Sequence, residues 1–98
     1  MPWQVVKRLR SSPRSASQAR SFCASRLGSV LGDGPGIDEL VHEAGTVVGE
    51  LVTNAVNAGA TWVELCLCLL PRRVRIEVSD DSGTVAAELE LPAADEAS

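Results

Sequence analysis

The sequence predicts a small α/β protein, a two-layer sandwich in which two helices pack on one face of a mostly antiparallel sheet. Two observations predict this class. Apolar residues first recur at steps of three and four over 14–31 and 37–58, as on the buried side of a helix. The period then changes to two over 63–78, as on strands with one buried face. The 98 residues are enough for one domain of this kind.

Residues 1–12 show no steady period, so we expect a flexible basic leader or a short edge strand before a domain that spans 13–98. Residues 1–32 hold six of the nine Lys and Arg residues and none of the 13 acids. Such a start can be a transit peptide or can contact an anionic partner, although a leader followed by a basic helix is the simpler interpretation. The acidic remainder argues against binding to nucleic acid, because it would repel phosphates.

The first helix is predicted over 14–31. Ser15 to Gln18 have the S-x-x-Q form of a capping box, in which the serine side chain caps the helix start. The glycine-rich turn 32–36 separates this helix from a second one over 37–58. The apolar stripe of the second helix comprises Ile37, Leu40, Val41, Ala44, Val48, Leu51, Ala55 and Val56.

An antiparallel hairpin is predicted next, with its turn at 71–73. The residues expected on its apolar face are Val63, Leu65, Leu67, Leu69, Val74, Ile76 and Val78. Beyond Gly83, apolar residues at 85, 89 and 91 fit either a short strand or an ordered loop, and we expect 93–98 to be mobile. We interpret Cys66 and Cys68 as ordinary reduced cysteines on the opposite face, without a metal.

Polar residues gather at two places. On the second helix, Glu43, Glu50, Asn54 and Asn57 lie near one line of the surface. After the second hairpin strand, the run 79–83 (Ser-Asp-Asp-Ser-Gly) places two acids where the strand enters a turn. Taken singly, the first pattern is typical of a solvated helix face and the second of a turn, although loops at strand ends also gather binding groups.

Together, the two patterns resemble the GHKL, or Bergerat-fold, ATPase superfamily, and within it the anti-sigma-factor serine kinases. GELVTNAVNA, residues 49–58, is similar to their N box, and VRIEVSDDSG, residues 74–83, is similar to the strand and opening of their first glycine box. The resemblance implies that 13–98 is a partial histidine kinase-like ATPase domain, with a partial Bergerat fold.

The resemblance also implies roles for five residues in binding ATP and Mg²⁺. Asn54 matches the amide that coordinates Mg²⁺, a hard cation suited to an amide oxygen. Glu50 matches the catalytic glutamate that orients or deprotonates the attacking group. Asp80 matches the carboxylate that accepts a hydrogen bond from the adenine amino group, and Ser82 and Gly83 lie in the glycine box.

The sequence departs from the family pattern at three points. Asn57 and Ala58 stand where the family often has a basic residue or a histidine. Ser82 and Thr84 stand where the family has glycines that let the backbone approach closely. The sequence ends at Ser98, where the family continues into a second glycine box whose backbone amides cradle the phosphates. We therefore expect a truncated member or a fragment. A complete site would act as a serine/threonine kinase, whereas we expect these 98 residues alone to be inactive.

The expected partners are a sigma factor and an anti-anti-sigma protein, in cytoplasmic regulation of transcription, with neither nucleic acid nor membrane bound directly. No apolar run approaches the ~20 residues that span a bilayer. The alternative is a non-catalytic protein-interaction module with a vestigial nucleotide site. Apolar surface left uncovered by the absent strand and helix would then favour a partner or a homodimer.

Overall fold

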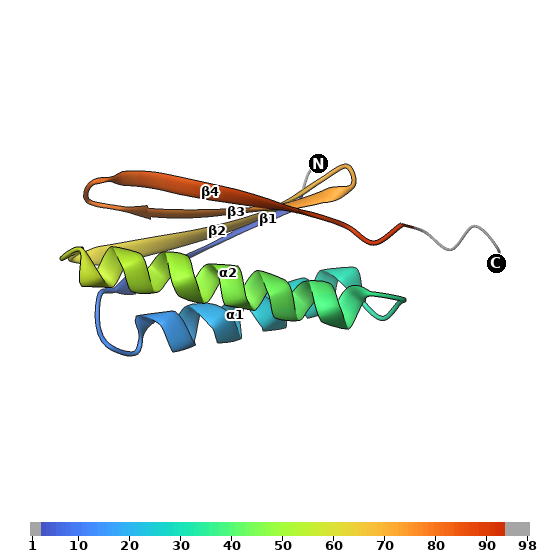
Figure 1. The fold of residues 1–98 in the computed structure, drawn as a ribbon, viewed down its shortest axis with the longest axis horizontal. Coiled ribbons are helices and arrows are strands. Elements are labelled where there is room, and N and C mark those ends of the chain that lie inside the picture. Colours follow the sequence, from blue (N-terminus) through green and yellow to red (C-terminus); the bar gives the residue numbers. More distant parts are fainter. Residues whose placement is uncertain (1–2, 94–98) are drawn as a thin grey trace.

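A computed structural model, which describes residues 3–93, confirms the α/β class. It contains two helices and one four-stranded sheet, and Figure 1 shows both helices on the same face of that sheet. The elements are β1 (Gln4–Arg10), α1 (Ser15–Leu31), α2 (Ile37–Asn57), β2 (Trp62–Leu70), β3 (Arg73–Asp80) and β4 (Gly83–Glu90). No helix in this part of the chain is both long and apolar enough to cross a membrane.

The strands lie in the order β1-β2-β3-β4, and each is antiparallel to its neighbour. The structure decides between the two alternatives for the start of the chain: Gln4–Arg10 form an edge strand on β2, and not a loose leader. Val5 and Leu9 hold it in place, because they are half-buried and pack against the core. β4 forms the other edge, so the region after Gly83 is a strand. Most of the segment expected to be mobile, 94–98, lies outside the described residues.

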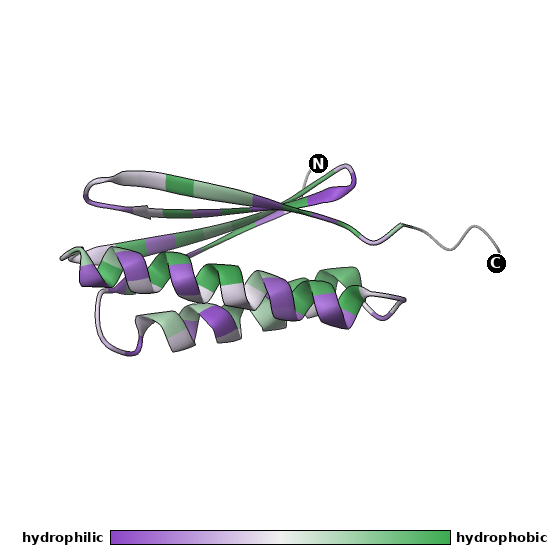
Figure 2. Cartoon of the chain, viewed as in Figure 1, coloured by the Kyte–Doolittle hydropathy of each residue, from purple (hydrophilic) through white to green (hydrophobic). Residues whose placement is uncertain are grey.

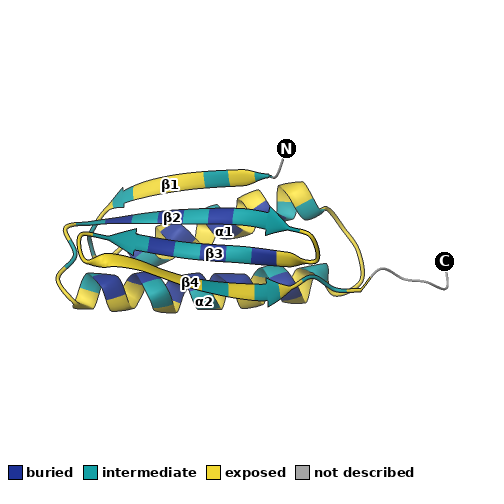
Figure 3. Cartoon of the chain, turned by 90° about the horizontal axis from the view of Figure 1, so that it is seen from above, coloured by how far each residue is buried: buried dark blue, intermediate teal, exposed yellow. Residues whose placement is uncertain are grey.

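The core lies between the two layers, as Figure 3 shows by the buried positions along β2 and β3. The predicted inward rows are correct: Val63, Leu65 and Leu67 are at most 1% exposed, and the facing residues of β3 are also buried. The buried residues of α2 supply the matching apolar stripe, and Figure 2 shows hydrophobic and hydrophilic residues alternating along this helix. The helical residues that complete the core are Ala19, Cys23, Leu27, Leu40, Ala44, Val48, Val52 and Ala55.

The predicted capping box at the start of α1 is wrong. Arg14 occupies the cap position, and no side chain caps the helix. Ser15 is instead the first residue of the helix and is completely buried. Its Oγ donates a hydrogen bond to the carbonyl oxygen of Arg10 (3.1 Å) and accepts one from the backbone N–H of Ser12 (2.8 Å). The hydroxyl therefore joins β1 to α1. Both bonds are needed, because a buried polar group without a partner is costly.

Candidate functional site

Two of the predicted site residues, Glu50 and Asn54, lie one turn apart on α2 and line the same open pocket of about 500 Å³. The helical repeat explains this, because residues four apart project from the same side. α1 supplies the third charged or amide-bearing residue of the pocket, Arg20. The pocket is lined by Arg20, Thr46, Gly49, Glu50, Thr53 and Asn54.

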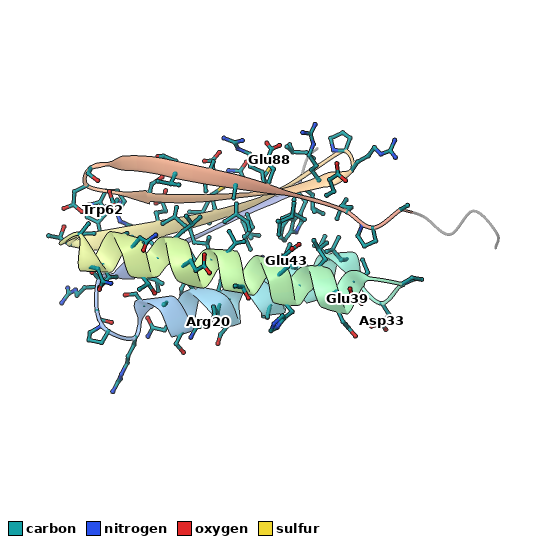
Figure 4. All side chains as sticks on the ribbon, viewed as in Figure 1. Arg20, Asp33, Glu39, Glu43, Trp62 and Glu88 are labelled. Atoms are coloured by element: carbon teal, nitrogen blue, oxygen red, sulfur yellow. The ribbon has the colours of Figure 1, made fainter. Side chains whose placement is uncertain are left out.

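Arg20 reaches the pocket because α2 has a glycine where the arginine crosses it. A Cβ added to Gly49 would lie 2.8 Å from Arg20 Nη1 and 3.2 Å from its Cδ, which is closer than van der Waals contact. Figure 4 labels Arg20 on α1, in the layer formed by the two helices. Arg20 is not one of the predicted site residues. The signal available was a glycine within a helix, which disfavours the helix and therefore suggests close packing.

The pocket combines a carboxylate, a carboxamide and a guanidinium on exposed side chains. The hydroxyl of Thr46 is used locally, since it donates to the carbonyl oxygen of His42 (3.2 Å). A guanidinium is suited to phosphate oxygens, and an amide oxygen is suited to a hard cation. The set could therefore bind an anionic ligand together with its counter-cation.

The other predicted site residues, Asp80, Ser82 and Gly83, form the turn between β3 and β4. The Oδ1 atom of Asp80 accepts hydrogen bonds from both the hydroxyl and the backbone N–H of Ser82, each at 2.7 Å. These bonds, that of the hydroxyl first, hold the pKa of the Asp80 carboxyl below its ordinary value. Gly83 has a φ of 146°, which side chains disfavour, so glycine suits this corner.

Asp81, which the sequence analysis did not single out, fastens this turn to the rest of the molecule. Its Oδ1 accepts the backbone N–H of Thr61 (3.0 Å), and its Oδ2 accepts the Thr61 hydroxyl (2.6 Å). These bonds lower the pKa of the Asp81 carboxyl. Because Thr61 lies between α2 and β2, the turn is held at the end of the molecule where α2 finishes (Figure 1).

The five predicted residues thus fall into two groups. Glu50 and Asn54 share the pocket on α2, whereas Asp80, Ser82 and Gly83 are not among its lining residues. Asp80 pairs with Val63, whose side chain faces the helices, so the strand alternation places the carboxyl on the helix-covered face. The polar side of α2, opposite its buried residues, faces away from the core, whereas Asp80 lies on the face of the sheet that the helices cover.

Two other kinds of group bear on chemistry, namely side chains that could ligate a metal and the buried thiol of Cys23. Within residues 3–93, no group of three or more His, Cys, Asp or Glu side chains could hold a metal ion. Burial raises the pKa of the Cys23 thiol to about 11, which keeps it protonated at neutral pH.

No protein-family model matches the chain, and no curated protein matches its sequence. The resemblance to GHKL ATPases rests on the two motifs described above.

Proposed function

We propose that this chain is an ATP-binding regulatory domain similar to the anti-sigma-factor serine kinases. The observation that carries the proposal is the pocket on α2, in which Glu50 and Asn54 lie together beside Arg20. The N-box motif assigns Glu50 to catalysis and Asn54 to the coordination of Mg²⁺. The guanidinium adds a positive charge where a triphosphate needs one.

The phosphate end of Mg-ATP fits the chemistry of this pocket. Asn54 would supply one oxygen to Mg²⁺, which keeps most of its waters and takes its remaining ligands from the nucleotide. Arg20 would offset the negative charge of the phosphates, next to the Glu50 carboxylate. Glu50 would orient or deprotonate the attacking hydroxyl, and the protein would act mainly by positioning and charge neutralisation.

The adenine end fits less directly. Asp80 already accepts two hydrogen bonds on Oδ1, but a carboxylate offers about four lone-pair sites and keeps acceptor capacity for an amino group. A nucleotide bound at α2 would have to extend around the end of the helix to this turn, which Asp81 ties to Thr61. Ser82 and Gly83 would then border the base.

In this proposal the biological role is transcriptional regulation in the cytoplasm. The domain would hold a sigma factor, and a complete site would transfer the γ-phosphoryl group of ATP to a serine or threonine of an anti-anti-sigma protein. The same surface could bind these partners without catalysis, which is the second candidate function. One observation favours this second function. Asp80 accepts hydrogen bonds from the hydroxyl and the backbone N–H of Ser82 within its own turn, as expected of a carboxylate whose role is to stabilise a turn in a vestigial site.

Calorimetric titration of Mg-ATP distinguishes the two functions. ATP binding predicts saturable heat with the wild type and at least ~10-fold weaker binding, equal to about 1.4 kcal/mol, for Asn54→Ala and Asp80→Asn. Asn57→Ala is a matched control, because this exposed amide lies on α2 but outside the pocket lining. Mg-GTP should not bind, since guanine has a carbonyl oxygen where adenine has the amino group. No saturable heat with the wild type would reject ATP binding and leave the interaction module.

A further inference from the structure

The two edge strands of the sheet differ in how they are protected from pairing. On β1, Lys7 lies opposite Leu65 and therefore on the helix-facing side, and Arg8 and Arg10 add further charge. An inward-pointing charge on an edge strand opposes the addition of another strand. On β4 the corresponding side carries Val85, Ala87 and Leu89, which have no charge.

This apolar row on β4 is poorly covered. Val85 is 57% exposed, more than the other exposed large hydrophobic residues, Val6 and Val30. α2 contacts β4, yet Ala87 and Leu89 remain only half-buried. Figure 3 shows β4 at the border of the sheet, with exposed positions along much of the strand. An eight-residue strand with one free edge and an uncharged inner side is a ready template for another strand.

We propose that β4 pairs in an antiparallel manner with β4 of a second copy of this chain, about a two-fold axis at Ala87. The paired strands would join the two sheets into one, with both helical layers on the same face. In this register Val85 lies opposite Leu89 of the second copy, and Ala87 lies opposite itself. On the helix-facing side, apolar residues then meet only apolar residues, which buries Val85.

The charges of β4 favour this register over its neighbours. Glu88 would face Ala86 of the second copy, and Glu90 would face Thr84. An axis at Glu88 would place two carboxylates directly opposite, which is destabilising. An axis at Ala86 would place Leu89 opposite Gly83, which has no side chain to pack.

Glu88, on the outer side of β4, is already paired within one chain. Arg73 Nη1 lies 3.1 Å from Glu88 Oε1, and Arg75 Nη1 lies 2.9 Å from Glu88 Oε2. Glu88 therefore brings little net charge to the proposed interface. A two-fold pair is closed, because it uses the β4 edge of each copy once. The pairing does not depend on nucleotide binding, because it involves neither the α2 pocket nor Asp80.

Sedimentation equilibrium of the full chain tests the pairing. The wild type should dimerise in the micromolar range, and Val85→Lys, which copies the inward charge of β1, should be a folded monomer by circular dichroism and mass. Val6→Lys is the matched control, because Val6 is 50% exposed on the opposite edge, and this variant should remain dimeric. A monomeric wild type, equal dimerisation of wild type and Val85→Lys, or open-ended assembly would overturn the proposal.

A disulfide tests the register without relying on a disruptive variant. In a Cys66→Ser, Cys68→Ser background, Ala87→Cys should form a disulfide-linked dimer on mild oxidation, because antiparallel partners lie within disulfide reach. Val85→Cys in the same background should not, because its partner is Leu89. Cys23 is kept in both, since it is completely buried. Equal cross-linking of both variants, or of neither, would overturn the two-fold axis at Ala87.

Discussion

At the residue scale, single polar side chains connect segments that the apolar pattern leaves separate. Ser15 joins the end of β1 to α1, and Asp81 joins the β3–β4 turn to Thr61. Each acts through two hydrogen bonds to groups near an element end, where backbone N–H and C=O groups would otherwise need water. The Asp81 contacts hold the turn that carries Asp80 near the end of α2.

The Asp81 contacts predict a pH dependence of stability. The folded-state pKa of Asp81 is lowered by the bonds from Thr61, so its contribution is complete above the unfolded-state pKa and is lost as the pH falls through the lower folded value. Asp80 is shifted in the same direction by Ser82. We expect the urea midpoint of the wild type to fall below about pH 4.

The Asp81→Asn variant should show a shallower fall over the same range, because an amide does not titrate but still accepts the Thr61 N–H. Asp33→Asn, in the exposed loop between the helices, serves as the control and should follow the wild type. Identical pH profiles for wild type and Asp81→Asn would show that the carboxylate does not stabilise the fold through these bonds.

At the element scale, the two interior glycines of α2 have different reasons to be there. Both Gly45 and Gly49 are buried on α2, which packs on α1. A Cβ added at Gly45 meets nothing within 4 Å, whereas one added at Gly49 meets the Arg20 side chain. Only Gly49 is explained by close approach, and it is the glycine that lines the candidate pocket.

Alanine substitutions should separate these two positions. Gly45→Ala should raise the free energy of unfolding by about 0.5–1 kcal/mol, because alanine favours the helix and the space is open. Gly49→Ala should gain clearly less, because Arg20 must be displaced. Urea unfolding of wild type and both variants provides the measurement. Equal stabilisation by the two substitutions would indicate that Arg20 is not held over Gly49 in solution.

At the scale of the whole molecule, both layers share one core. The buried residues of α1, α2, β2 and β3 form a single cluster, to which residues of β1 and β4 add only half-buried side chains. A domain with one core is expected to unfold in one cooperative transition. The edges are consequently the least supported part of the sheet, which agrees with a role for β4 as a surface for association.

A cavity in this core should destabilise the entire domain. Leu67 is completely buried, so Leu67→Ala should cost about 2–5 kcal/mol, a large share of the 5–15 kcal/mol that is usual for a domain. Leu70→Ala, at a half-buried position on the outer face, should cost much less. Tryptophan fluorescence, from Trp3 and Trp62, and far-UV circular dichroism should report the same transition in both variants. Separate transitions from the two probes would contradict a single core.

The fold class, the two helices and the hairpin could be predicted from the sequence, because their apolar periods record which face is buried. The proximity of Glu50 and Asn54 could also be predicted, since a spacing of four acts within one helix. The pairing of the first strand with β2, and the reach of Arg20 to the pocket across Gly49, became visible in the folded structure alone. These contacts join residues far apart in the chain, and no local period encodes which distant partner a strand or a side chain will meet.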